Sequence, residues 1–254
     1  MLVAERQQKI VDAVNEKNSL RVSELSQMFS VTEETIRRDL EKLEKDKKLR
    51  RSHGGAVKIN QSSHEIPYSE RKVINVQEKK DIGIEAVKHV VEGDSLILDA
   101  STTAYYMAKA LPNVPLTVVT NSVKVAIELS EKKEITIIST GGILNTRSMA
   151  YLGPLAESSL DDYHVNKAFI SCKGIHLVRG ISESNEQQAR IKRKMLESAE
   201  INFVMVDHSK FGIQAFSRFA ELDIVDHILS DQKIDNEIFQ KLSERSMNVI
   251  RVGT

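Results

Sequence analysis

Three features that mark other classes of protein are missing from this sequence of 254 residues. The single cysteine, Cys172, excludes an internal disulfide and a shared thiolate metal site, so we expect a small buried apolar residue there. No uninterrupted apolar run reaches the length of a membrane span, and no basic-then-apolar leader follows Met1. The sequence therefore predicts a cytoplasmic protein without membrane, metal or cofactor.

Net charge is also absent, because 36 basic residues balance 36 acidic ones. The distribution is uneven: residues 37–58 hold nine lysines or arginines against four acidic residues, a local excess of five positive charges. The remainder of the chain carries about the same negative excess, which phosphate would repel. This pattern indicates a small basic module on an acidic body, and the length is sufficient for two domains.

A strongly patterned helix begins in this region after Thr32. The Thr32 hydroxyl suits an N-cap, and Ile36, Leu40 and Leu43 fall on one face at about 100° per residue. Charged residues cluster on the opposite face, while Asp39 lies toward the packed flank and is expected to pair with a neighbouring basic residue. A solvated charged face on an ordinary amphipathic helix would give the same pattern, so the neighbouring elements decide its role.

Those neighbours predict a winged helix-turn-helix. Residues 5–17 form a helical pattern, and a short second helix, capped by Ser23, places Met28 and Phe29 inward. The order of helix, short helix, tight turn and long helix makes the third helix the DNA reader. Residues 49–59 then have a β-like apolar flank on each side of a Gly-Gly turn, which predicts a small hairpin or wing.

Four motifs in this region carry a family resemblance: Val22-Ser-Glu-Leu, Phe29-Ser-Val-Thr, Thr35-Ile-Arg-Arg-Asp-Leu and Arg51-Ser-His-Gly-Gly-Ala. Together they resemble the amino-terminal signature of the DeoR family of bacterial transcription regulators. The resemblance implies a winged helix-turn-helix domain over residues 1–59, whose reader helix enters the major groove of operator DNA. Side-chain chemistry then assigns DNA contacts to Thr32, Glu34, Thr35, Arg37, Arg38, Lys42, Arg50, Arg51, His53 and Gly54.

A second, larger domain is predicted after a polar stretch that contains the first proline. We assign the linker to residues 60–75 and the domain to residues 76–254, with one long helix over residues 70–91. Continuous apolar runs then alternate with helical stretches, which indicates an α/β domain with a mainly parallel sheet covered on both faces. The predicted strands are residues 96–98, 116–119, 135–138, 168–170, 203–206, 227–229 and 249–252.

Polar residues collect at the ends of these strands, where parallel sheets bind ligands. Asp99-Ala-Ser-Thr-Thr opens a helix and offers hydroxyls and free backbone N–H groups, as a phosphate site requires. Thr120-Asn-Ser, Gly141-Gly with Arg147, and Asp207-His-Ser-Lys follow later strands. Each group alone is more often an ordinary loop, but four of them on one sheet edge favour a binding site.

The order of these elements, with Gly180-Ile-Ser, Lys192-Arg-Lys-Met-Leu and Asp207-His-Ser-Lys-Phe-Gly, also resembles the carboxy-terminal sensor domain of the DeoR family. That domain is similar in fold to ribose-5-phosphate isomerase and binds phosphorylated sugars. For Lys192 there is an alternative interpretation: it lies on an exposed helix face, where a cation needs no ligand. The strand ends and the resemblance together indicate a set of effector-binding residues. They are Asp99, Ser101, Thr102, Thr103, Thr120, Asn121, Ser122, Gly141, Gly142, Arg147, Lys173, Lys192 and Lys210.

One stretch departs from the family pattern. Where the family commonly has Gly-Ala-Asp-Gly-Ile-Asp, this chain has Ser171-Cys-Lys-Gly-Ile-His, so Lys173 and His176 replace two carboxylates. The related isomerases use acidic residues in this region for proton transfer, and a protonated lysine is a poor general base near neutral pH. The change favours sensing over turnover, and Lys173 is expected to bind a phosphate or another anionic part of the effector.

The sequence therefore predicts a DNA-binding transcriptional regulator and not an enzyme: a repressor of a sugar-catabolic operon that a phosphorylated sugar releases from DNA. A homo-oligomer, dimer or tetramer, is expected because one winged module buries little DNA surface. The alternative is a sugar-phosphate isomerase-like enzyme with an accessory DNA-binding domain, which Asp99 and Glu183 keep open. A nucleotide-dependent oxidoreductase is disfavoured, since no glycine-rich dinucleotide fingerprint opens the α/β domain.

Overall fold

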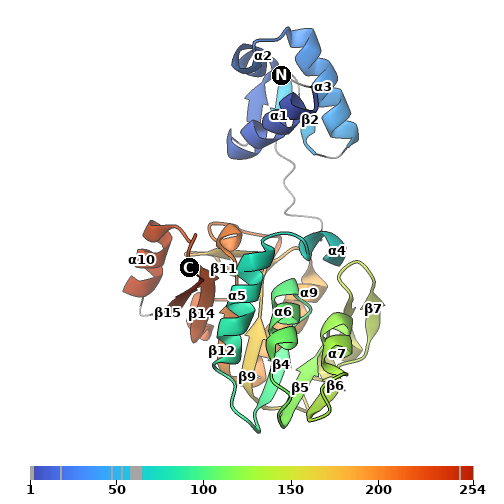
Figure 1. Ribbon diagram of the computed structural model, residues 1–254, viewed down its shortest axis with the longest axis vertical. Helices are drawn as coiled ribbons and strands as arrows, with labels where there is room; N and C mark the ends of the chain where they lie inside the picture. The colour runs from blue at the N-terminus through green and yellow to red at the C-terminus, as the bar shows by residue number, and fades with distance from the viewer. Residues whose placement is uncertain are drawn as a thin grey trace. The chain divides into compact units, whose positions relative to one another are not determined.

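Two compact units make up the chain, residues 1–61 and residues 62–254, here called the N-terminal unit and the C-terminal unit. None of the helices in the described part of the chain is both long and apolar enough to cross a membrane. The computed structural model (Figure 1) describes residues 3–17, 19–46, 48–52, 54–57, 65–245 and 247–253.

The described residues of the N-terminal unit form three helices and a three-stranded antiparallel sheet in the order β1-β3-β2. Helix α2 begins at Val22 with Arg21 as its N-cap, so the predicted cap at Ser23 is wrong, and Met28 is exposed rather than inward. The predicted order of three helices followed by a hairpin is confirmed. The elements are α1 (Val3–Lys17), β1 (Ser19–Arg21), α2 (Val22–Phe29), α3 (Glu33–Lys45), β2 (Arg50–Ser52) and β3 (Gly55–Val57).

A seven-stranded sheet, with every neighbouring pair parallel, forms the centre of the C-terminal unit. Its order is β15-β14-β12-β9-β4-β5-β6, so the chain builds outward from β4 in one direction and then from β9 in the other. All seven predicted strands are present. They are β4 (Ser95–Leu98), β5 (Leu116–Thr120), β6 (Ile135–Ser139), β9 (Val165–Ile170), β12 (Ala199–Met205), β14 (His227–Asp231) and β15 (Asn248–Val252).

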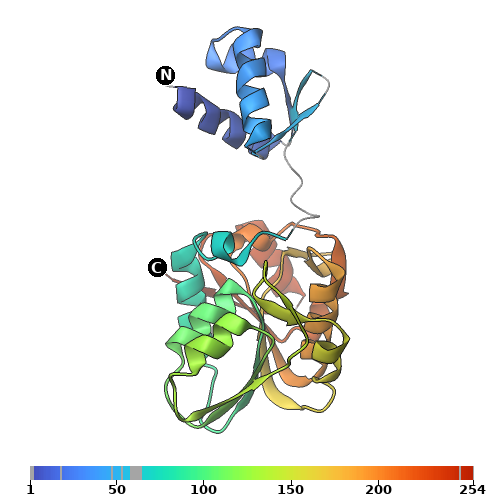
Figure 2. The same ribbon diagram turned by 90° about the vertical axis from the view of Figure 1, so that its right-hand side faces the viewer.

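Helices cover both faces of this sheet, as continuous apolar strands require. Figure 2 shows the two layers, with the green helices on one side and the yellow and orange elements on the other. One layer consists of α5 (Val76–Val87), α6 (Thr102–Ala110) and α7 (Val123–Leu129), and the other includes α8 (Pro154–Ser158), α9 (Glu186–Glu197) and α10 (Asn236–Glu244). The predicted fold class, a small winged unit followed by a larger α/β unit, is confirmed.

Several short elements were not predicted. They are the hairpin β7 (Ile143–Asn145) and β8 (Ala150–Leu152), a small antiparallel sheet of β10 (Gly174–His176), β11 (Gly180–Glu183) and β13 (Ser217–Ala220), and the 3-10 turns η2 (His208–Lys210) and η3 (Leu222–Ile224). Strand β8 lies over the end of β5, because the Tyr151 N–H donates to the Asn121 carbonyl at 2.7 Å. This position matters for the ligand site.

Residues 65–75 form a packed segment of the C-terminal unit, which we call the strap. It contains the short helix α4 (Tyr68–Arg71), whose Tyr68 is buried and donates its N–H to the Arg147 carbonyl at 2.8 Å. The one long helix predicted over residues 70–91 is instead α4 and α5, separated by a turn. The described part of the predicted linker therefore packs on the α/β unit.

Candidate functional site

The reader helix α3 has the packing that its sequence predicts. Thr32 is the N-cap, and its hydroxyl accepts the Thr35 N–H at 3.3 Å. Ile36, Leu40 and Leu43 are each at most 1% exposed and belong to the core of the N-terminal unit. One face of the helix is thus fixed, and the opposite face is free to contact DNA.

That opposite face carries exposed charges that are held only by neighbours on the same helix. Arg37 donates to Glu33 at 2.6 Å, and Arg38 lies 3.4 Å from Glu34, with about half to four-fifths of these side chains exposed. Exposed ion pairs of this kind contribute little and exchange readily. The predicted DNA contacts Thr32, Glu34, Arg37, Arg38 and Lys42 all lie on the surface, and Thr35 is half-buried.

Asp39 has the structural role that its position predicts. Its buried carboxylate accepts hydrogen bonds from Arg6 Nε at 2.6 Å and from Gln7 Nε2 at 2.8 Å. Both donors belong to α1, so this ion pair fixes the first helix against the reader helix. The predicted pairing of Asp39 with a basic residue is confirmed.

The wing is built around two glycines with different constraints. Gly54 has φ +84° in the turn between β2 and β3, and a Cβ on Gly55 would lie 2.3 Å from the Leu20 carbonyl oxygen. Arg51 is exposed, and its N–H donates to Glu44 at 2.8 Å. The predicted contact His53 and the side chain of Arg50 lie outside the described residues.

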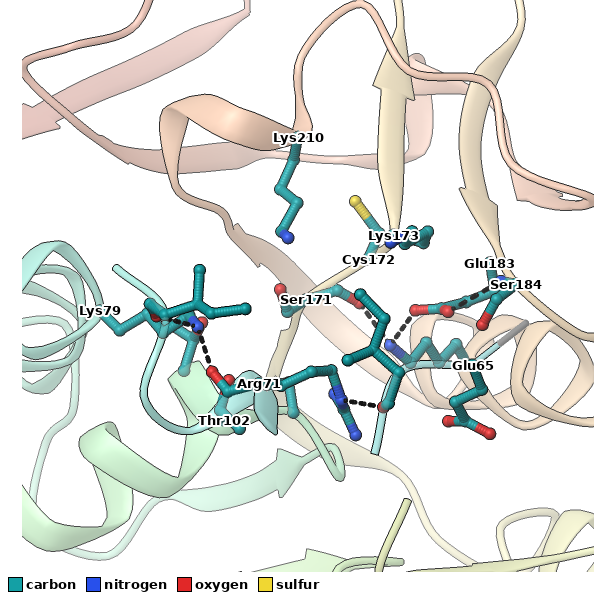
Figure 3. Close-up of a pocket in the computed structure, with 15 residues that line it drawn as sticks. Glu65, Arg71, Lys79, Thr102, Ser171, Cys172, Lys173, Glu183, Ser184 and Lys210 are labelled. Carbon is teal, nitrogen blue, oxygen red and sulfur yellow. Dashed lines mark hydrogen bonds and ion pairs between the residues drawn. The ribbon is translucent and has the colours of Figure 1, made fainter. Parts of the chain in front are cut away.

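A pocket opens between the ends of β4 and β9, where the order in which the chain adds strands reverses, which is the usual ligand position in open α/β sheets. Figure 3 shows its lining, with Lys79 and Lys210 approaching from one side and Glu65, Glu183 and Ser184 on the other. Cations outnumber carboxylates in this lining. The residues are Glu65, Ile66, Arg71, Ile74, Lys79, Ser101, Thr102, Thr103, Ser171, Cys172, Lys173, Glu183, Ser184, Lys192 and Lys210.

The start of helix α6 contributes hydrogen-bond donors to this pocket. Ser101 is its N-cap and accepts the Ala104 N–H at 3.0 Å. The N–H groups of Thr102 and Thr103 lie in the first turn, where no intrahelical acceptor exists. These N–H groups and the threonine hydroxyls, together with the positive end of the helix dipole, favour an anion.

Lys192, a predicted effector residue, is already saturated within the protein. Its ammonium donates to Glu183 at 2.6 Å and to the Ser171 carbonyl at 2.7 Å, and it lies 3.0 Å from Asp99. Burial lowers the pKa of Lys192, but the carboxylates of Glu183 and Asp99 outweigh burial and raise it. This buried triad fixes the pocket floor, and Lys192 is not the exposed helix cation of the alternative interpretation.

Lys173 and Lys210 differ from Lys192 in having no such partner. Among the described residues, no hydrogen bond or ion pair holds either ammonium group. Burial lowers the pKa of Lys173, and the charge of Lys210 lowers it further, so the two cations lie close enough to repel. A dianionic ligand would relieve this repulsion.

Arg71 and Lys79 were missed by the sequence analysis. Lys79 is only 4% exposed, and burial lowers its pKa to about 8. The signal was present in its spacing, because Lys79 shares the buried face of α5 with Ile82, Gly83 and Ala86. A lysine within a helix's apolar stripe is a candidate for a buried, functional cation.

Asp99 and Arg147 lie near the pocket without lining it. The fully buried Asp99 carboxylate accepts N–H groups from Ser101 at 3.1 Å and Ser171 at 2.9 Å, and so joins the two loops beneath the pocket. Arg147 Nε donates to the Glu65 carbonyl at 2.5 Å. Both predicted residues therefore position other parts of the site.

Five other predicted effector residues are not brought to this pocket. Thr120, Asn121 and Ser122 are buried at the end of β5, where Asn121 donates to the Tyr151 carbonyl of β8 at 3.1 Å. Gly142 has φ +103°, and its added Cβ would lie 2.8 Å from the Leu152 carbonyl, while Gly141 precedes it. The unpredicted hairpin β7–β8 covers this part of the sheet edge. Cys172, by contrast, is buried as expected.

Comparison with known proteins agrees with this division. A model described as the DeoR-like helix-turn-helix domain matches residues 6–62, and one described as the DeoR C terminal sensor domain matches residues 74–232. Within solved structures, ribose 5-phosphate isomerase A from Methanocaldococcus jannaschii is 19% identical, with a TM-score of 0.41, over 54% of this chain and 55% of that one.

Two curated relatives extend over nearly the whole chain. A Bacillus subtilis protein named as the uncharacterized HTH-type transcriptional regulator YulB is 57% identical over 252 residues, covering 99% of this chain and 98% of the relative. The L-fucose operon activator of Haemophilus influenzae is 37% identical over 240 residues, covering 94% and 96%. With both domain models matched in order, the chain belongs to the DeoR family of helix-turn-helix transcriptional regulators.

Proposed function

We propose that this regulator senses a phosphorylated sugar in the pocket between β4 and β9. The observation that carries the proposal is the pair Lys173 and Lys210, two cations that no hydrogen bond or ion pair holds among the described residues and that line the same pocket as the free N–H groups of α6. Cations whose ammonium groups make no hydrogen bond or ion pair with the described residues, together with an open helix start, are complementary to a phosphate dianion. Glu65 and Glu183, on the other side of the pocket, offer acceptors for sugar hydroxyls.

The sugar phosphate acts by favouring a state of the protein that binds DNA weakly. For this to happen it must bind that state more tightly than the DNA-bound state, and DNA must weaken effector binding by the same factor. Repression is the simpler outcome, because occupying operator DNA excludes polymerase without a further contact surface. A relative named as an operon activator makes activation the alternative.

Operator DNA sets two further features of the proposal. The protein acts in the cytoplasm, where the operator DNA of a bacterial cell lies. Paired half-sites on that DNA require a homo-oligomer, dimer or tetramer. The enzyme alternative has little left to support it. Asp99 and Glu183, on which it depended, both bind the Lys192 ammonium, and the family consists of regulators.

The test is DNA binding to the upstream region of the protein's own gene, at fixed salt, with a panel of sugar phosphates and their unphosphorylated parents. Fixed salt is essential because phosphate contacts make DNA affinity steeply salt-dependent. We expect one sugar phosphate, and not its parent, to release the DNA. Lys173→Ala should weaken that effector about tenfold or more and leave DNA affinity intact, with the exposed Lys80→Ala as the matched control. Release by the unphosphorylated parent alone would contradict the proposal.

A further inference from the structure

The strap, which follows the N-terminal unit closely in sequence, is also a wall of the pocket. The N-terminal unit ends at residue 61, and the strap begins at Glu65. Four strap residues, Glu65, Ile66, Arg71 and Ile74, line the pocket. A ligand in the pocket therefore contacts the same piece of chain that carries the DNA-binding unit.

Glu65 holds the beginning of the strap against the C-terminal unit. Its carboxylate accepts hydrogen bonds from Gln188 Nε2 and Asn185 Nδ2, both at 3.0 Å, at the start of α9. Its carbonyl accepts the Arg147 Nε–H at 2.5 Å. One half-buried residue thus fixes the strap to two separate elements, so the loss of its carboxylate should release this end.

The strap's own carbonyls hold two of the pocket's cations. Arg71 Nε donates to the Ile66 carbonyl at 3.1 Å, and Lys79 Nζ donates to the carbonyls of Arg71 at 2.7 Å and Ile74 at 2.5 Å. These acceptors are neutral carbonyls, whereas a phosphate oxygen adds the attraction of a full negative charge to the hydrogen bond. An anion that enters the pocket therefore competes with the strap's internal bonds for Arg71 and Lys79.

We propose that residues 65–75 transmit effector binding to the DNA-binding unit: the strap docked through Glu65 is the DNA-binding state, and a bound anion loosens it by taking Arg71 and Lys79. The inference rests on the proposed function, because it needs an anionic effector in this pocket. The inference adds the element that couples the two sites: DNA favours the docked strap, and the effector favours the loosened strap. Glu65 is a positioning residue in this scheme.

The first experiment needs no ligand. Glu65→Ala and the milder Glu65→Gln should raise hydrogen exchange of the strap amides and weaken binding to the upstream DNA about tenfold, within the usual range of such couplings. Glu70→Ala is the matched control, since Glu70 is an exposed glutamate of the same strap. Glu65 variants with the same exchange and DNA affinity as the unaltered protein would overturn the proposal.

The second experiment separates the strap from the pocket. Hydrogen exchange of the full chain is followed with inorganic phosphate and with ribose 5-phosphate as probes. We expect exchange to fall at residues 101–103 and to rise in residues 66–75. Protection of residues 101–103 without any change in the strap overturns the strap proposal and leaves the pocket intact. No protection from either probe counts against the anion pocket, and it overturns the effector-driven loosening of the strap as well, even if Glu65→Ala still weakens DNA binding.

Discussion

Arg38 on α3 and Lys192 on α9 are both helix cations beside carboxylates, yet 79% of the Arg38 side chain is exposed against 7% for Lys192. The DNA-facing charges of α3 project into solvent, where their partners lie on the same helix and are easily exchanged for phosphate. The charges on the floor of the pocket are buried, and Lys192 binds carboxylates from two other elements. Long-range attraction to a polyanion needs the first arrangement, and selection of one small ligand needs the second.

The largest effect, on stability, is expected from removing the buried cation Lys192. Lys192→Met leaves the Asp99 and Glu183 carboxylates buried without their cation, which should lower the stability of the C-terminal unit by about 3–5 kcal/mol. Lys194→Met is the control, since Lys194 lies on the same helix as Lys192 and makes a surface ion pair with Asp161. Urea unfolding measures both variants. Equal losses would mean that burial of the pair does not matter.

Removal of an exposed charge from α3 should change DNA affinity and not stability. Arg38→Ala should weaken binding to the upstream DNA by about 1–3 kcal/mol if it contacts a base, or reduce the salt slope by about one if it contacts a phosphate. Thermal unfolding of the variant should stay unchanged. Anisotropy titrations at several salt concentrations distinguish the two contacts, and the exposed Lys80→Ala again serves as a control. An unchanged titration curve would remove Arg38 from the interface.

The buried Lys79 should make both stability and anion affinity depend on pH. Burial lowers its pKa from 10.5 to about 8, so between these values the unfolded chain keeps a proton that the folded chain has lost. Stability should therefore rise with pH across this window in the unaltered protein relative to Lys79→Met. Anion affinity should fall by a few-fold as the pH rises through 8, because the ligand loses a cation. Calorimetric titration of inorganic phosphate from pH 7 to 9 tests this, and parallel profiles for both proteins would contradict it.

The smallest effect is expected at the exposed Glu33–Arg37 pair. Glu33→Gln removes a partner of Arg37 at 2.6 Å together with a negative charge near the DNA-facing surface. Stability should change by less than about 1 kcal/mol, while DNA affinity rises a few-fold at low salt and this gain disappears at high salt. A gain that persists at high salt would point to a rearranged contact instead of charge.

The sequence predicted the large elements because each was encoded locally. Ile36, Leu40 and Leu43 define the packed face of the reader helix by spacing alone, and the seven parallel strands are continuous apolar runs. The hairpin β7–β8 has strands of three residues each, too short for a periodic signal. Its position over β5 depends on long-range contacts, which is why the ends of β5 and β6 were assigned to the effector site.

The same reason explains what was missed in the pocket. Ser101, Thr102 and Lys210 follow strands, so the rule of strand ends found them, whereas Lys173 was found as a departure from the family pattern. Arg71 and Ile74 lie where the assigned linker overlaps the start of the long helix predicted over residues 70–91. Only tertiary packing shows that this stretch is a wall of the site. Their binding roles, like those of the other predicted contacts, remain predictions for the experiments above.

The far end of the strap also has a consequence for synthesis of the chain. Asn75 donates to Asp207 at 2.8 Å across 132 residues of sequence, whereas the core of the N-terminal unit is complete by Ala56. At roughly 5–20 residues per second on the ribosome, the DNA-binding unit emerges several seconds before the strap can dock. A nascent chain thus possesses its DNA reader before it possesses the means to control it.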